Sequence, residues 1–449
     1  ILCEKCVHVC NEIIGDDAIT LQFGGYKSSV IPKNSDKLDC TFCGECIAVC
    51  PVGALVSTDF KYSANAWELS QVPATCVHCS AGCSLNYETR HTANSTGAAA
   101  KIYRVTNDFE HTTLCGAGRF GFDFTVQSEK DVHALNDAVD AIRATKAIRF
   151  NSLITNEEAF ILQKMKEEND IKLFNEEARL YQKFMNAYSS FSGKQGFGGT
   201  LDALQKSDAV IVIGGRISTD NPAVRYAMTT AAKHNGAKVI YMHPLEDALL
   251  QNVVTQFAKY EVGTEEGVIA MLAKTLLSNS DLPDEYRQFF DDLDEGYLCA
   301  ESNIGDEEFA LITKTLARKK NKTLVYTMGS IGSTQLVLPA LNSQEGTFVN
   351  INYQLLPTNV AVEFDGYTLN DVSKHFGIQA VNTIDYTPNL PSEKGFISKP
   401  FDDLGNFYSF LGEDTRGYIL ENIDVPLHGS LEPVEDLPEF NGSIVYRCN

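Results

Sequence analysis

The sequence is short of positive charge, of tryptophan and of long apolar runs. Its 449 residues include 37 Lys and Arg against 59 Asp and Glu, and the formal net charge is −22. Because nucleic acids are bound mainly through positive charge, no nucleic-acid partner is expected. No run of roughly 18 or more apolar residues occurs, so no segment is expected to span a bilayer, and membrane association would go through partners. The one tryptophan, Trp67, is expected to serve packing.

Cysteine is absent from a long middle stretch and frequent near the start. Of 13 cysteines, none lies between residues 126 and 298, and Cys299 and Cys448 stand alone. We interpret these two as buried thiols without chemistry. The others form short motifs in a large chain, which argues against a small disulfide-stapled secreted protein. Such thiolate-rich motifs favour a reducing, cytoplasmic compartment, and no signal peptide is visible.

The window CTFCGECIAVCP carries the strongest motif. It places Cys40, Cys43, Cys46 and Cys50 before Pro51, which is the bacterial ferredoxin pattern for a cubane [4Fe-4S] cluster. Two-residue spacings let three thiolates converge from one tight loop. The fourth cysteine, followed by a proline that we expect to begin a helix, serves a second cluster. One such motif therefore predicts another.

A partner motif stands at the start of the chain. There Cys3, Cys6 and Cys10 repeat the last three positions of the ferredoxin pattern, and the cysteine at its first position would precede Ile1. We therefore expect the sequence to be a fragment. Crossed ligation, as in two-cluster ferredoxins, predicts two ligand sets. One is Cys10, Cys40, Cys43 and Cys46; the other is Cys3, Cys6, Cys50 and the cysteine expected before Ile1.

Structural zinc is the alternative for this region, because zinc also uses cysteines two residues apart. Zinc sites usually group their ligands two and two, whereas here three cysteines and one trailing cysteine recur, so we favour iron-sulfur clusters. Between the motifs, residues 16–32 predict a hairpin that turns at Gly24-Gly25, which suits a two-cluster ferredoxin.

A third cysteine group follows with a different spacing. Cys76, Cys79 and Cys83 in TCVHCSAGC are followed by Cys115 in TLCGAGRFG, with a β-rich loop expected between them. Three close ligands and one distant ligand fit a cubane better than a zinc ribbon. The flanking His78 and His111 are interpreted as surface residues or as neighbours of the ligands. Arg119 is left with two interpretations, as a partner of an acidic group or of a cluster sulfur.

From about residue 126 the pattern becomes α/β. An apolar strand over 207–215, a helix over 221–236 and a second strand over 237–244 predict a parallel sheet, and 322–341 predicts a further strand and helix. Gly214-Gly215 lacks the GxGxxG pattern, so a tight turn is favoured over a dinucleotide site. We interpret the acidic residues within 280–309 as a solvent-exposed face or loop. Carboxylates such as Asp123, Glu157 and Glu158 are interpreted as helix-start or surface charges.

These motifs, with SLITNEEAF, DAVIVIGG, EGTFVNINYQLLPTN and FDGYTLND, resemble the large iron-sulfur subunit, called the G subunit, of bacterial respiratory complex I, NADH:quinone oxidoreductase. The resemblance implies an α/β fold with an N-terminal α+β ferredoxin-like region. It implies a two-cluster 4Fe-4S ferredoxin-type domain over 1–68, a 4Fe-4S domain of molybdopterin oxidoreductase type over 69–125, and a molybdopterin-oxidoreductase-like α/β domain without its cofactor over 126–449. The cysteine expected before Ile1, Cys3, Cys6 and Cys50 would hold one cubane of the electron chain.

The same resemblance implies the surroundings of the chain. A [2Fe-2S] cluster and a further [4Fe-4S] cluster are expected upstream of the fragment, in addition to three [4Fe-4S] clusters within it. Partners would be other subunits of the peripheral arm, with the membrane arm reached indirectly, at the cytoplasmic face of the bacterial inner membrane. No direct NAD site is expected in this chain.

One feature departs from the family pattern. Many sequences of this family keep only the last cysteine of the second motif, whereas this chain has Cys40, Cys43 and Cys46 together with Cys10. An extra cubane is therefore expected, as in formate dehydrogenase α subunits. The electron donor and the subfamily stay open.

A molybdenum enzyme, such as a formate dehydrogenase α subunit, and an NAD-linked hydrogenase subunit remain alternatives. Molybdenum in formate dehydrogenase needs an early Cys or selenocysteine ligand, which residues 126–298 lack, so no molybdenum and no catalytic residue are predicted. The favoured function is single-electron relay toward quinone from NADH or another donor. A third possibility is a scaffold whose clusters only close loops.

Overall fold

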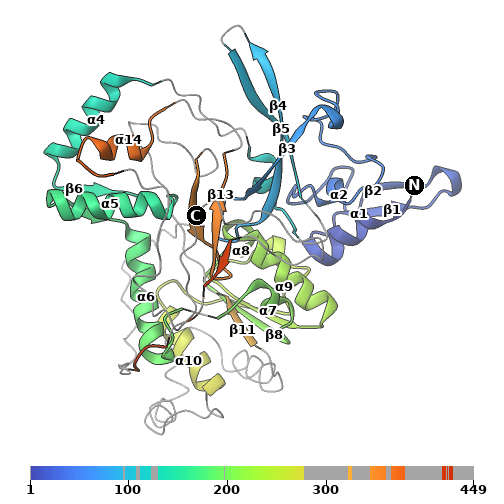
Figure 1. Ribbon diagram of the computed structural model, residues 1–449. Coiled ribbons are helices and arrows are strands. Elements are labelled where there is room, and N and C mark those ends of the chain that lie inside the picture. Colours follow the sequence, from blue (N-terminus) through green and yellow to red (C-terminus); the bar gives the residue numbers. More distant parts are fainter. Residues whose placement is uncertain are drawn as a thin grey trace, which may run out of the picture.

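A computed structural model describes residues 2–94, 97–107, 112–122, 130–196, 198–277, 322–325, 344–360, 366–379, 417–420, 422 and 424–427. The cysteine-rich beginning of the chain lies on one side, next to the hairpin sheet and to the parallel sheet of the later residues (Figure 1). The predicted mixed α/β content is confirmed.

The first 50 residues form few regular elements. Helix α1 (Lys5–His8) continues into a π-helix, η1 (Val9–Ile14), and the short helix α2 (Glu45–Ala48) lies in the second cysteine motif. Strands β1 (Ile19–Gln22) and β2 (Ser29–Pro32) pair antiparallel around the 3-10 turn η2 (Gly25–Lys27). The predicted hairpin is therefore confirmed, because Gly25 supplies the left-handed conformation (φ 60°) that its turn requires.

Two expectations for the following connector are wrong. No helix begins at Pro51, since residues 51–55 form turns and bends, and Gly53 adopts a φ of 62° that interrupts a helix. Trp67, in the 3-10 helix η3 (Ala66–Glu68), is 83% exposed and does not pack in a core.

The loop between Cys83 and Cys115 is β-rich, as predicted. Strands β3 (Ser70–Thr75), β4 (Ser84–Asn94) and β5 (Gly97–Thr106) form an antiparallel sheet with a register shift at Glu88/Thr89. The sheet packs on its own buried core, formed by Ala74, Cys76, Leu85, Tyr87, Ile102, Val105 and Leu114. The short helix α3 (Gly116–Phe120) begins directly after Cys115.

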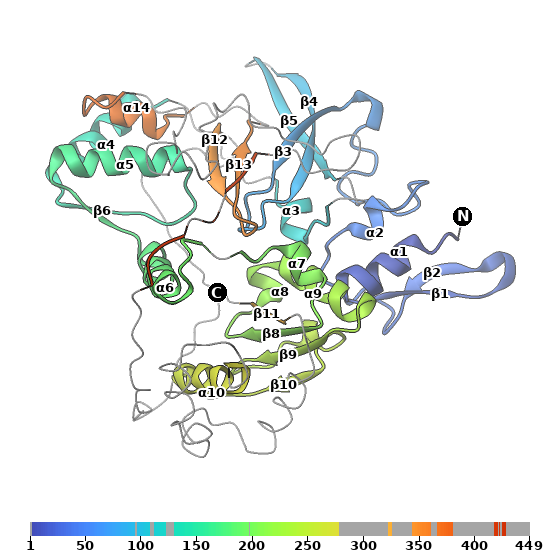
Figure 2. The same ribbon diagram turned by 60° about the horizontal axis from the view of Figure 1, so that its bottom comes forward.

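A parallel sheet in the order β10-β9-β8-β11 confirms the predicted strand-helix-strand unit. Its strands are β8 (Ala209–Ile213), β9 (Lys238–Met242), β10 (Gln256–Ala258) and β11 (Lys322–Val325). All five residues of β8 are buried, and successive residues face opposite sides of a strand. One side packs on helix α10 (Glu265–Leu277), and the other packs on helix α9 (Pro222–His234). Helix α9 also lies beside η1 (Figures 1 and 2).

The remaining described elements lie outside this sheet. They are helices α4 (Val132–Ala144), α5 (Asn156–Asn169), α6 (Glu176–Ser192), α7 (Leu201–Gln205), α8 (Ile217–Asp220) and α14 (Leu369–Lys374), the 3-10 helix η4 (Ala248–Leu250), and strands β6 (Ala147–Arg149), β7 (Lys172–Phe174), β12 (Gly346–Val349), β13 (Gln354–Thr358) and β14 (Tyr418–Ile419). Strands β6 and β7 pair parallel, and β12-β13-β14 form an antiparallel sheet. Helices α4, α5 and α14 share one apolar core.

The helix-start interpretation of Glu157 and Glu158 is confirmed, whereas a surface position is wrong. Both lie in the first turn of α5 and are 3% and 6% exposed. Glu158 forms a capping box with Thr155, and Glu157 accepts the backbone N–H of Thr347 at 2.8 Å. Asp123, His111, Cys299, Cys448, residues 280–309 and the predicted helix after residue 330 lie outside the described residues. Within the described part of the chain, no helix is long and apolar enough to cross a membrane.

Candidate metal centres

Four thiols from two segments lie near one another at the first candidate centre. Burial raises the pKa of Cys46 to about 11, and the neighbouring thiols of Cys10, Cys40 and Cys6 contribute to that rise. Burial also raises the pKa of Cys43, and the neighbouring Cys46 and two acidic groups add to that rise. The backbone N–H of Ala18 donates to the Sγ of Cys10 at 3.3 Å. The structure thus places Cys10 beside the Cys40–Cys46 loop.

A second group adjoins the first. Burial raises the pKa of Cys6, and the thiols of Cys3 and Cys50 add to the rise. At Cys50 burial also favours the protonated thiol, but backbone amides led by that of Leu55 outweigh it, so the net pKa is lowered. The turn after Pro51 therefore points its N–H groups at a sulfur, which is why it does not continue as a helix.

The third group is the most deeply buried. Burial raises the pKa of Cys76 to about 12 and that of Cys79 to about 11, and the Cys115 thiol contributes to both shifts. The carbonyl of Cys83 accepts the N–H of Cys76 at 2.7 Å, which closes the loop between them. The N–H of Gly118 donates to the Sγ of Cys115 at 3.5 Å.

Thiol donors in such groups suit iron-sulfur clusters, and unpartnered buried polar atoms also fit a bound group. Among the described residues, two buried side-chain nitrogen or oxygen atoms lack a hydrogen-bond partner: the Oγ1 of Thr75, next to Cys76, and the Nε of Arg225. No three His, Cys, Asp or Glu side chains in this part of the chain converge on a point that would hold one metal ion. A cubane, which is bound at its corners, takes sulfur atoms farther apart than a single ion does.

Arg119 joins the first and third groups. It follows Cys115 in α3, and its Nη2 lies 2.7 Å from the Oε1 of Glu45, between Cys43 and Cys46. Its Nε donates to the carbonyl of Cys43 at 2.9 Å. The acidic-partner interpretation of Arg119 is thereby confirmed. Burial raises the pKa of Glu45, and Arg119 opposes that rise.

The two loops also touch through their backbones. A Cβ placed on Gly116 would lie 3.1 Å from the carbonyl oxygen of Phe42, so a glycine follows Cys115 at a point where the two loops lie close together. Tyr226 of α9 is 4% exposed, and burial raises its pKa well above the usual range with contributions from both Cys43 and Cys115. The first and third groups therefore share one buried boundary.

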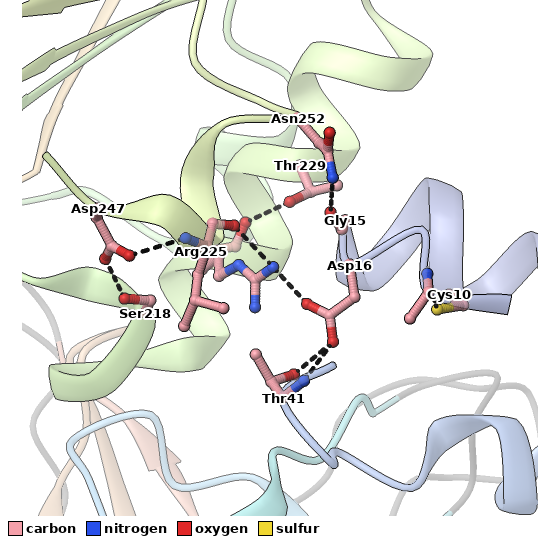
Figure 3. Close-up of polar contacts among 11 residues, drawn as sticks. Cys10, Gly15, Asp16, Thr41, Ser218, Arg225, Thr229, Asp247 and Asn252 are labelled. Atoms are coloured by element: carbon pink, nitrogen blue, oxygen red, sulfur yellow. Dashed lines mark hydrogen bonds and ion pairs between the residues drawn. The ribbon is translucent and has the colours of Figure 1, made fainter. Parts of the chain in front are cut away.

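Helix α9, which packs on the parallel sheet, contacts both groups. At its start, the Nδ2 of Asn221 donates to the Oγ of Ser80 at 3.0 Å, beside Cys79. Four residues on, the Nη2 of Arg225 lies 2.6 Å from the Oδ1 of Asp16 (Figure 3). Sequence reasoning missed Asp16, Glu45 and Arg225. The one signal for Arg225 was a charged residue among the apolar positions of NPAVRYAMTTAA.

His78 is exposed, so its interpretation as a surface residue is confirmed. Partial burial of its ring lowers its pKa, and the ring also contacts the backbone of Gly121 just after α3. It is therefore placed beside the third group, which agrees with the interpretation as a neighbour of the ligands.

Comparison with known families supports the cysteine assignment. Residues 1–54 match the family described as 4Fe-4S dicluster domain. The chain is 24% identical over 314 residues to NADH-quinone oxidoreductase G subunit 2 of Rhizobium meliloti, covering 64% of this chain and 35% of the relative. This chain is a relative of the NADH-quinone oxidoreductase G subunits. It is also 30% identical over 302 residues to NADPH-Fe(3+) oxidoreductase subunit alpha of Geobacter sulfurreducens, covering 62% of this chain and 35% of that protein.

The predicted resemblance to the large iron-sulfur subunit of NADH-quinone oxidoreductase is thus confirmed, as is the presence of a 4Fe-4S domain. The chain spans about a third of the length of these curated relatives, 35% in both cases. Among solved structures, acetylene hydratase from Pelobacter acetylenicus matches with a TM-score of 0.36 and 9% identity, covering 57% of this chain and 40% of the other.

Proposed function

We propose that the chain is an iron-sulfur electron-transfer subunit that relays electrons from NADH or another donor toward quinone. The observation that carries this proposal is that successive thiol groups lie next to one another. Helix α1, which carries Cys6, lies against α2, which carries Cys46, and Gly116 after Cys115 approaches the carbonyl of Phe42. The relationship to the NADH-quinone oxidoreductase G subunits and the dicluster match support it.

The proposed ligands follow the crossed pattern. One set is Cys10, Cys40, Cys43 and Cys46; another is Cys76, Cys79, Cys83 and Cys115; and Cys3, Cys6 and Cys50 supply three ligands of a further cluster. When bound, [4Fe-4S] clusters supply single-electron storage. The residues of this chain bind them, exclude water from the two deeper groups and fix their separation. No acid-base residue is needed for this work, and no molybdenum is proposed.

The three-part layout, with boundaries near 68 and 125, belongs to the same proposal. Partners are other peripheral-arm subunits, placed at the cytoplasmic face of the bacterial inner membrane, and NAD would bind elsewhere. An α/β domain of molybdopterin-oxidoreductase type would act here without its cofactor, as a support for the cluster loops.

A second candidate is a subunit of an oxidoreductase with a different donor and acceptor. The 30% identity to NADPH-Fe(3+) oxidoreductase subunit alpha, together with the complete Cys40, Cys43 and Cys46 set, favours it. A molybdenum-dependent formate dehydrogenase α subunit and an NAD-linked hydrogenase subunit are related possibilities. Stoichiometric molybdenum in the anaerobically purified protein would favour the formate dehydrogenase.

The test is anaerobic reconstitution followed by iron and sulfide analysis and electron paramagnetic resonance. Two complete thiol sets predict about eight irons per chain, with more if the third set binds iron. Cys43→Ser should remove one cubane signal and leave its neighbour, because the proposed sets share no thiolate. Loss of every ferredoxin-type signal in a folded Cys43→Ser protein would show that the crossed assignment is wrong.

A further inference from the structure

One carboxylate joins the two segments that supply the first thiol group. The N–H groups of Gly15 and Asp17 donate to the carbonyl of Cys10 at 3.1 and 3.2 Å, which fixes Asp16 beside Cys10. The Oδ2 of Asp16 accepts both the N–H and the Oγ1 hydroxyl of Thr41 at 2.7 Å. Because Thr41 directly follows Cys40, Asp16 ties the η1 segment to the Cys40–Cys46 loop.

The other oxygen of this carboxylate is held from the α/β domain. The Nη2 of Arg225 lies 2.6 Å from the Oδ1 of Asp16, and the two side chains are 1% and 3% exposed (Figure 3). The same Nη2 donates to the carbonyl of Leu249 at 3.0 Å, and the Oδ1 of Asp247 accepts the N–H of Leu249. The guanidinium is thus anchored in its own domain while it reaches into the cysteine region.

The surrounding contacts hold the Asp16–Arg225 pair in place. Gly15 has a φ of 83°, and a Cβ there would lie 3.0 Å from the Oγ1 of Thr229 on α9. The Oγ1 of Thr229 donates to the carbonyl of Arg225 at 2.9 Å, and the Nδ2 of Asn252 donates to the carbonyl of Gly15 at 3.4 Å. The turn at Gly15 therefore sits directly on the helix that carries Arg225.

We propose that Asp16 and Arg225 are positioning residues for the cubane of Cys10, Cys40, Cys43 and Cys46, and that they set its reduction potential. The inference rests on the proposed function, since it assumes that this group binds a cubane. It gives the α/β domain a direct part in the electron relay: a site whose ligands all come from the first 50 residues is completed by a residue of α9.

The sign of the expected effect follows from charge. Cluster potentials depend on nearby net charge and on burial, and the Asp16–Arg225 pair is neutral as a unit. Removing the cation leaves a buried carboxylate beside Cys10 and Cys40, which disfavours the more negative reduced cluster. Removing the carboxylate charge leaves the guanidinium, which favours the reduced cluster. The two single substitutions should therefore shift the potential in opposite directions.

The experiment uses the full chain, reconstituted anaerobically, and measures the potential of each cubane signal by electron paramagnetic resonance at defined potentials. Arg225→Met should lower the potential of the signal that Cys43→Ser removes, and Asp16→Asn should raise that potential. The double variant should return toward the parent value, because both charges are gone. Arg179→Met, which removes an arginine from an exposed pair with Glu176, is the matched control and should shift nothing.

Iron content and thermal unfolding distinguish a specific effect on the cubane's potential from loss of the cluster or of the fold. Arg225→Lys keeps the charge, so it should retain the iron and a near-parental potential even if Arg225→Met loses the cluster. Shifts of the same sign in Arg225→Met and Asp16→Asn, or unchanged potentials at full iron content, would overturn the inference. So would loss of iron from Arg225→Lys equal to that from Arg225→Met.

Failure of the proposed function would look different. If the parent protein takes up no cubane at the site of Cys43, both proposals fall. If the parent protein holds that cubane but substitutions at Asp16 and Arg225 leave its reduction potential unchanged, only this inference falls.

Discussion

The two cysteine-bearing regions differ in how they are stabilised. Residues 69–122 contain a three-stranded sheet with its own core around Leu85, Tyr87 and Leu114. Among the described residues before 69, the buried hydrophobic side chains are Ile14, Ala18, Ile19 and Val49, whereas Phe23, Tyr26, Tyr62 and Trp67 are exposed. So small a core cannot hold a fold alone, and support must come from bound clusters and from neighbouring domains.

Iron removal should separate the two regions most strongly. In the apoprotein we expect the amides of β1, β2 and η1 to lose protection from hydrogen exchange, because metal binding and folding are coupled where the core is small. Strands β8 and β9, which are buried on both faces, should keep theirs. Hydrogen exchange read by mass spectrometry measures both in one sample. Equal protection of the two parts without iron would contradict the comparison.

The ion pair between the regions should come next in size. Arg119→Met leaves Glu45 buried and uncompensated, and breaking such a pair costs about 3–5 kcal/mol. Denaturant unfolding of the reconstituted protein measures the loss. The double variant with Glu45→Gln should recover part of it, because no buried charge is then left alone. An Arg119→Met protein as stable as the parent would mean that the second region does not support the first through this contact.

A capping residue of helix α5 should have the smallest effect. Thr155→Ala removes the capping box of α5 and should cost about 1 kcal/mol of unfolding free energy. Because α5 has its own apolar core, the iron content should not change. Ser at position 155 is the matched control, since its hydroxyl can still accept the N–H of Glu158. Loss of iron in Thr155→Ala would show that the domains are coupled more widely than the two arginine pairs imply.

Local patterns predicted the parts of the molecule that local chemistry determines. The spacing of the cysteines, the Gly24-Gly25 hairpin and the unit of β8, α9 and β9 could all be read from neighbouring residues. The helix predicted to begin at Pro51 does not form, because the amides after this residue turn toward the Cys50 sulfur. The position of Glu158 at the start of a helix was predicted correctly. Its burial was not predicted, because that depends on the packing of α5 against β12.

The missed residues are those whose partners are distant in sequence. Asp16 and Arg225 are 209 positions apart, and Glu45 and Arg119 are 74 apart. Each charged residue taken singly looks like an ordinary surface residue, since charged side chains are seldom buried unless paired. Only the packing of α9 and α3 against the cysteine loops brings the partners together. No periodic pattern in a single sequence predicts that packing.

The distance of 209 positions between Asp16 and Arg225 has a consequence for biosynthesis. At about 5–20 residues per second, α9 follows Asp16 out of the ribosome by roughly 10–40 s. During that interval Asp16 has no Arg225 to pair with, whereas Arg119, which is made earlier, can already hold the loop through Cys43 and Glu45. Of the two partners of this ion pair, Arg225 on α9 is therefore made last, and the contact between α9 and the cysteine region forms only after the thiol loops exist.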